Sequence, residues 1–143
     1  MKLWHILVIA LLVRASLYIG LNIFFFGGEL EHPDSQLYHE WALVVQQLWI
    51  EGHLELIPYP EYSNVVALLY HIFGPNRYGP EGLNILLSLL NVVLGYKIIE
   101  RYGGSKKVAA VLLAVDPYMA YLSTQYLRDT ILLTGTLVLM YGV

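Results

Sequence analysis

Residues 3–26 constrain the fold of this chain more than any other segment. They form a run of 24 residues in which Arg14 is the single charge. Because a helix that crosses a hydrocarbon core about 30 Å thick needs roughly 20 apolar residues, this run is long enough to span a membrane. Lys2 precedes it, as in a signal peptide, but the run is too long for one and ends without a small-x-small cleavage site. We therefore predict an uncleaved membrane-spanning helix.

Three more apolar segments follow. Residues 83–99 form a slightly shorter second span, and residues 108–127 form a third, which Asp116 and Pro117 interrupt. Residues 131–143 are apolar but too short to cross a bilayer, so we expect the sequence to be truncated within a fourth helix. The expected fold is an all-α, polytopic membrane bundle of about three to four spans, with residues 1–143 in a single membrane domain.

The composition agrees with a membrane protein and excludes several other classes. Hydrophobic residues make up 57% of the chain and charged residues 13%, whereas soluble domains have about 45–50% and about 25%. Such an apolar chain is not disordered. A net charge of −3 provides no basic surface for nucleic acid, and the absence of cysteine excludes disulfides and thiolate metal sites.

The basic residues set the predicted topology. With a cytoplasmic N-terminus, five of them flank the spans on the inner side: Lys2, Lys97, Arg101, Lys106 and Lys107. Only Arg77 and Arg128 then lie outside, with Arg14 inside the membrane, as the positive-inside rule expects. This topology makes residues 27–80 a long external loop of an integral protein of the cell membrane.

Two helices are expected within the external loop. In the first, apolar residues recur at helical spacing, and Gly52 ends the pattern; they are Leu37, Trp41, Val44, Val45, Leu48 and Trp49. An amphipathic helix with two tryptophans on its apolar face is expected to lie in the membrane interface. The second helix, roughly residues 61–73, is too short to span a bilayer and ends before Gly74 and Pro75.

Two acids at the external face are candidates for chemistry. Asp34 opens the first loop helix and Asp129 follows the third span, beside Arg128. Each acid could simply cap the N-terminus of the next helix, and Arg128 could be an interfacial anchor. Alternatively, the two carboxylates could take a proton from a nucleophile while the nearby arginine binds a lipid-linked phosphate.

Charged residues within the spans and external histidines raise two further hypotheses. Arg14 and Asp116 are costly to bury in a membrane, so we expect them to form a structural ion pair. His32, His39, His53 and His71 could supply ligands to a divalent metal such as zinc or manganese. No HxxxH or HxxE spacing is present, which favours solvated or interfacial histidines.

Several motifs in order resemble a known enzyme family. They are Arg14 in the first span, residues 33–42 (PDSQLYHEWA), 59–62 (YPEY), 73–74 (FG), 83–84 (LN), 109–113 (AAVLL), Pro117 and 127–129 (LRD). This order resembles the N-terminal part of membrane glycosyltransferases of the GT-C type. These include the protein O-mannosyltransferases and the lipid A aminoarabinose transferases, which use lipid-phosphate-linked sugars.

The resemblance implies a function and a set of site residues. It implies transfer of a sugar from a polyprenyl-phosphate donor to a lipid, glycan or protein acceptor at the extracytoplasmic face. Asp34 and Asp129 would be catalytic, and the substrate contacts would come from Arg128, Tyr38, His39 and Arg77. Members of this family have more helices, so activity would need the remaining helices of the same enzyme or a partner subunit.

Two other classes of function stay open. The chain could be a non-catalytic membrane subunit or pseudoenzyme that binds a lipid carrier or partner helices. It could also be a small transporter-like or scaffold protein in which Arg14 and Asp116 are purely structural.

Overall fold

A computed structural model describes residues 2–25, 27 and 33–143, and these residues form helices and no strands. Helix α1 (Leu3–Tyr18) continues into a π-helical segment, η1 (Ile19–Phe25). The remaining helices are α2 (Pro33–Ile50), α3 (Tyr62–Phe73), α4 (Tyr78–Arg101), α5 (Lys106–Val115), α6 (Pro117–Ser123) and α7 (Asp129–Gly142). The all-α prediction is therefore confirmed over the described residues.

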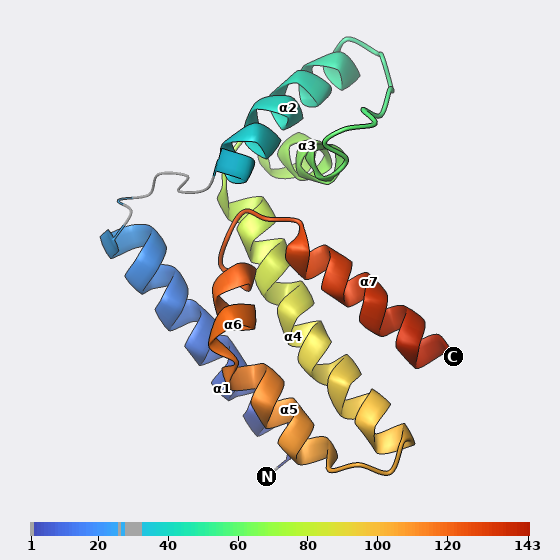
Figure 1. Ribbon diagram of the computed structural model, residues 1–143. Coiled ribbons are helices and arrows are strands. Elements are labelled where there is room, and N and C mark those ends of the chain that lie inside the picture. The colour runs from blue at the N-terminus through green and yellow to red at the C-terminus, as the bar shows by residue number, and fades with distance from the viewer. Residues whose placement is uncertain (1, 26, 28–32) are drawn as a thin grey trace.

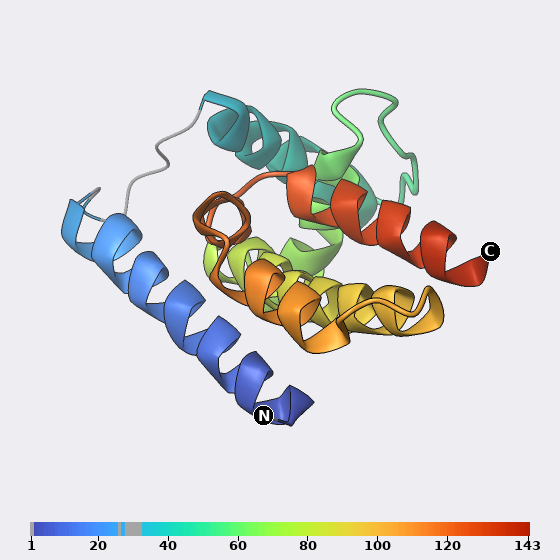
Figure 2. The same cartoon turned by 60° about the horizontal axis from the view of Figure 1, so that its bottom comes forward.

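The helices form a bundle with a hairpin at one end. Helix α4 is central and packs against α1, α3, α5, α6 and α7 (Figure 1). Figure 2 shows α1 and α7 on opposite sides of the α4 and α5 pair. Helices α2 and α3 pack on each other at the end of the bundle opposite the N-terminus and the α4–α5 turn (Figure 1).

Two helices are long and apolar enough to cross a membrane, Leu3–Phe25 and Tyr78–Arg101. They correspond to the first two predicted spans, although Phe26 lies outside the described residues. The second begins at Tyr78, five residues before its predicted start at residue 83. Pro80 does not prevent the earlier start because it lies in the first helical turn, where a backbone N–H has no partner within the helix.

The third predicted span is not one continuous helix. Helix α5 ends at Val115 and α6 begins at Pro117, which lies at the first helical position, where proline is favoured. Helix α6 then ends at Ser123, so the non-helical segment 124–128 precedes α7. This segment brings the start of α7 back to the α2–α3 hairpin.

Both predicted loop helices are present. Core packing divides the apolar stripe of α2, because Val45 is fully buried in the hairpin core while Trp41 and Val44 stay exposed. That core also contains side chains from α3 and from the segment before α7: Tyr62, Val66, Ala67, Tyr70, Tyr126 and Leu127. The apolar pattern therefore predicted the helix correctly, but only part of it faces away from the protein.

Candidate functional site

The predicted site residues meet where the hairpin contacts the segment before α7. Ser35 in the first turn of α2 donates its hydroxyl to the Tyr126 carbonyl oxygen at 3.1 Å. This hydrogen bond joins two parts of the chain that are 91 residues apart. It holds the start of α2, which carries Asp34, next to the start of α7, which carries Asp129.

Tyr38 is the point at which the charged candidates converge. Its side chain is buried, and that burial raises the pKa of its hydroxyl above the ordinary value. The charge of Arg128 opposes this rise, while those of Asp34 and Asp129 add to it. All three charged residues therefore lie within electrostatic reach of one phenol, and all three are exposed and open to a substrate.

The capping interpretation of the two acids is wrong. Helix α2 begins at Pro33, so Asp34 is already its second residue. Helix α7 begins at Asp129 itself, and the cap position is taken by Arg128, whose side chain makes no capping hydrogen bond. Because α2 begins two residues earlier and α7 one residue earlier than the capping interpretation required, neither carboxylate occupies a cap position.

His39 lies beside this site but belongs to a buried chain of hydroxyl groups. Its Nδ1 atom lies 2.6 Å from the Tyr70 hydroxyl, which lies 2.7 Å from the Tyr126 hydroxyl. Burial raises the pKa of Tyr70, so its hydroxyl stays protonated at neutral pH. The twelve tyrosines of the sequence gave no hint of this chain, because its members come from three separate segments.

Arg77 is held away from the two acids by a different partner. Its guanidinium forms an ion pair with Glu81 one turn later, with an Nη2 to Oε1 distance of 2.6 Å. Glu81 is 1% exposed and also accepts a hydrogen bond from the Tyr18 hydroxyl at 2.7 Å. This network connects the end of α1 to the start of α4, and the i, i+4 spacing of Arg77 and Glu81 could have revealed its first half.

Sequence reasoning missed a row of buried polar residues on α4. The row contains Glu81, Asn84, Ser88 and Asn91, which are all at most 4% exposed. Their spacing of three, four and three residues places them on one helical face, and this signal was readable in the sequence. Asn84 donates its amide to the carbonyl oxygens of Gln125 and Leu127, both at 2.8 Å, and so holds the segment before Arg128.

Replacing Asn84 with alanine is expected to lower the free energy of unfolding by about 2–4 kcal/mol. The change leaves two buried carbonyl oxygens without a donor. Asn91→Ala is a matched control, because Asn91 is a similarly buried asparagine on the same helix that donates to no carbonyl oxygen among the described residues. Denaturant unfolding of the purified chain in detergent measures both variants. Equal destabilisation by the two changes would contradict this role of Asn84.

The expected ion pair between Arg14 and Asp116 is not formed. Arg14 is 1% exposed and donates from Nη1 to Ala114 O at 2.9 Å and from Nη2 to Leu113 O at 3.3 Å, and also from Nε to the Ser88 hydroxyl. The Asp116 carboxylate instead accepts from Met119 N at 2.7 Å. The break between α5 and α6 explains both choices, because it frees carbonyl groups at one helix end and N–H groups at the next.

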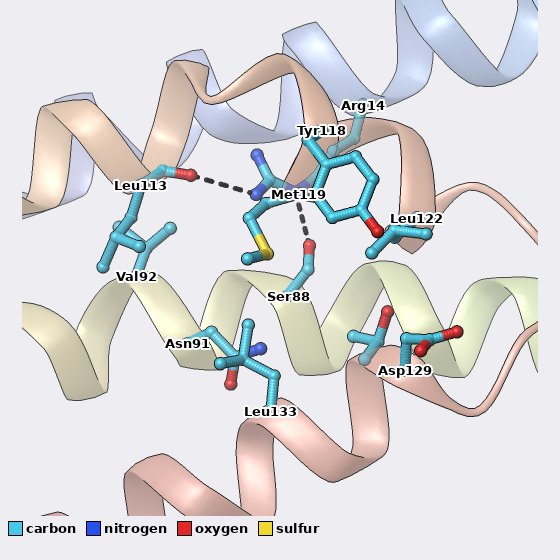
Figure 3. A pocket seen from close by; sticks show the side chains of 11 residues that line it. Arg14, Ser88, Asn91, Val92, Leu113, Tyr118, Met119, Leu122, Asp129 and Leu133 are labelled. Atoms are coloured by element: carbon cyan, nitrogen blue, oxygen red, sulfur yellow. Dashed lines mark hydrogen bonds between the residues drawn. The ribbon is translucent and has the colours of Figure 1, made fainter.

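A cavity of about 220 Å³ lies between Arg14 and the start of α7 (Figure 3). Its polar lining comes from four helices, α1, α4, α6 and α7: Arg14, Ser88, Asn91, Tyr118, Asp129 and Thr130. Val92, Leu113, Leu122 and Leu133 are among its apolar walls. Asp129 thus belongs both to the charged group around Tyr38 and to the wall of an internal cavity.

The histidines are dispersed in the structure. His53 and His71 are exposed, His39 contacts Tyr70, and His32 lies outside the described residues. Within residues 2–25, 27 and 33–143, no group of three or more histidine, aspartate or glutamate side chains could hold a metal ion.

Comparisons with known proteins do not identify the chain. No family model, curated protein or solved structure matches it.

Proposed function

We propose that this chain is the N-terminal segment of a glycosyltransferase that moves a sugar from a polyprenyl-phosphate donor to an acceptor at the extracytoplasmic membrane face. The observation that supports this proposal is the hydrogen bond from Ser35 to Tyr126, which holds the starts of α2 and α7 together, and the charges of Asp34, Arg128 and Asp129 all act on the nearby Tyr38 hydroxyl. Two exposed carboxylates and one exposed guanidinium at the same end of a membrane-type bundle are the groups that such a transfer requires.

Each charged group has a role in the proposed reaction. The acceptor hydroxyl oxygen bonds to the anomeric carbon, and its proton passes to the Asp34 carboxylate. The bond between the anomeric carbon and the phosphate oxygen breaks, and the electron pair leaves with the phosphate. Arg128 stabilises the negative charge of the departing phosphate. Asp129 orients the acceptor or the donor sugar.

The proposed topology places the N-terminus and the α4–α5 turn in the cytoplasm. These two parts lie at the same end of the bundle, and the α2–α3 hairpin lies at the other (Figure 1). Lys2, Lys106 and Lys107 are at the first end, whereas the site around Tyr38 is at the second. This arrangement supports a site at the extracytoplasmic face of the membrane, with these basic residues on the cytoplasmic side.

A second candidate function is that of a non-catalytic subunit which binds partner helices or a lipid carrier. The exposed apolar side chains on α7, such as Leu132, Leu139 and Met140, favour it because another helix could cover them. The two functions differ in their requirement for the acids. A catalytic segment needs both carboxylates, whereas a binding subunit tolerates their replacement by amides.

Native mass spectrometry of the chain solubilised from its own host tests the lipid-donor proposal. We expect a polyprenyl phosphate to co-purify with the wild type and to fall about 10-fold in Arg128→Ala, because a charge-assisted hydrogen bond to phosphate is lost. Arg101→Ala is the control, since Arg101 is an exposed arginine at the opposite end. A lipid-free wild-type chain, or equal retention by both variants, would argue against a donor phosphate at Arg128.

A further inference from the structure

The cavity next to Arg14 contains a polar group that the protein itself leaves unused. Asn91 is 4% exposed and lines the cavity, and its Oδ1 atom has no hydrogen-bond partner within the described residues. A buried amide oxygen without a partner costs about 1–3 kcal/mol. Glu81 and Ser88 have hydrogen-bond partners, and Asn84 donates its amide to two carbonyl oxygens although its own Oδ1 is also unpaired. Asn91 differs from Asn84 in that its unpaired side chain lines the cavity.

Arg14 also retains binding capacity on the same cavity wall. A guanidinium has five N–H groups, and hydrogen bonds to Ser88, Ala10, Ala114 and Leu113 account for four of them. The fifth, on Nη2, has no acceptor among the described residues. No carboxylate lies within ion-pair distance of the guanidinium in this part of the chain. The cation is thus neutralised only by carbonyl dipoles and by the more distant Asp116.

The volume of the cavity allows a ligand larger than one water molecule. Its volume of about 220 Å³ far exceeds the roughly 10–15 Å³ that one water molecule needs. Arg14 and Asp129 stand on different sides of it, as Figure 3 shows. The Asp129 side chain is exposed, so water screens its charge from an anion beside Arg14.

These groups select for an oxyanion. The positive charge of the Arg14 guanidinium repels metal ions and other cations. A neutral hydroxyl ligand would leave that charge uncompensated. A phosphate matches the planar guanidinium, and the Asn91 amide can donate to a second phosphate oxygen. A protonated phosphate oxygen can in turn donate to Asn91 Oδ1.

We propose that this cavity binds a phosphate group, with Arg14 supplying the charge and Asn91 fixing its orientation. The phosphate is either inorganic or the head group of a lipid. The site is distinct from the exposed Arg128, and the inference does not depend on sugar transfer.

The test is thermal unfolding of the full chain in detergent, titrated with two probes. One probe is inorganic phosphate, and the other is short-chain phosphatidic acid, with the diacylglycerol of the same chains as the control lipid. A ligand that binds the folded state raises the unfolding midpoint by an amount that grows with the logarithm of its concentration above its Kd. We expect at least one phosphate probe to raise the midpoint in this way, and Asn91→Leu to weaken the binding about 10-fold, so that about 10 times more probe is needed for the same rise. Arg101→Ala, at the far end of the bundle, is expected to leave it unchanged.

The outcomes separate the alternatives. A response to both phosphate probes indicates a site for free phosphate, and a response to phosphatidic acid alone indicates a lipid head group. If Asn91→Leu does not fold, Asn91→Ser removes the amide with a smaller change. No response to either probe, or an unchanged response in the Asn91 variant, would overturn the proposal. Loss of the response in Arg128→Ala but not in the Asn91 variant would also overturn it, while supporting the lipid phosphate at Arg128.

Discussion

Asp34→Asn is expected to lower the rate of sugar transfer by about 100- to 10,000-fold, the usual contribution of a general base. Asparagine keeps the size of the side chain but cannot accept the proton of the acceptor hydroxyl. Because Asp34 is exposed, the change should leave the fold intact. The measurement is transfer of radiolabelled sugar from a polyprenyl-phosphate donor by membranes of the native host, which contain any further helices the site needs.

Glu40→Gln is the matched control for this experiment. Glu40 is also an exposed acid on α2, but it lies on the side where its carboxylate accepts a hydrogen bond from Gln36 at 3.0 Å. It should retain full activity. Asp129→Asn should resemble Asp34→Asn, and the double variant should be little worse than either single one, because groups that act as a unit are not additive. Normal transfer by both asparagine variants would remove the catalytic proposal and favour a binding subunit.

The helices were predictable because their signals are local. Residues 3–25 and 78–101 each contain a stretch long and apolar enough to cross a membrane, and Gly74 and Pro75 mark the end of α3. The predictions were wrong where tertiary packing determines the start of a helix or the face that it buries. Pro80 was expected to lie before the second span, yet it fits into the first turn of α4. The apolar stripe of α2 could not show which side would face α3 and which would stay exposed.

The candidate site was predictable only in part. The order of motifs suggested that Asp34 and Asp129 act together, although they are 95 residues apart in the sequence. The structure adds the contacts that bring them together, chiefly the bond from Ser35 to Tyr126. Such partners could not be predicted, because a serine hydroxyl and a backbone carbonyl carry no pattern in a single sequence. The catalytic role of the acids remains a prediction.

The partner of Arg14 could not be predicted for the same reason. Opposite charges suggested Asp116, which is visible in the sequence, whereas the actual acceptors are mainly backbone carbonyl oxygens of α5. Every residue has a carbonyl group, so only the position of the helix break determines which ones are free.

Arg14→Ala is therefore expected to destabilise the bundle by about 3–5 kcal/mol, because several buried hydrogen bonds to a charged group are lost at about 1.5–3 kcal/mol each. The change leaves the Ser88 hydroxyl and the carbonyl groups of Leu113 and Ala114 without their donor, and it separates α1 from α4 and α5. Denaturant unfolding in detergent measures the loss. Arg14→Lys should recover part of it, since an ammonium keeps the charge but reaches fewer acceptors than a guanidinium.

Variants of Asp116 distinguish this interpretation from an ion pair. Asp116→Asn should cost little, because asparagine caps a helix about as well as aspartate and can still accept from Met119 N. An ion pair predicts instead that Asp116→Asn is nearly as harmful as Arg14→Ala, and that exchanging the two residues restores stability. We expect the exchange to be worse than either single change, because it puts an aspartate against the carbonyl ends of α5 and an arginine against the N–H groups of α6. Recovery of stability in the exchanged variant would show that charge pairing, and not the helix break, holds Arg14 in place.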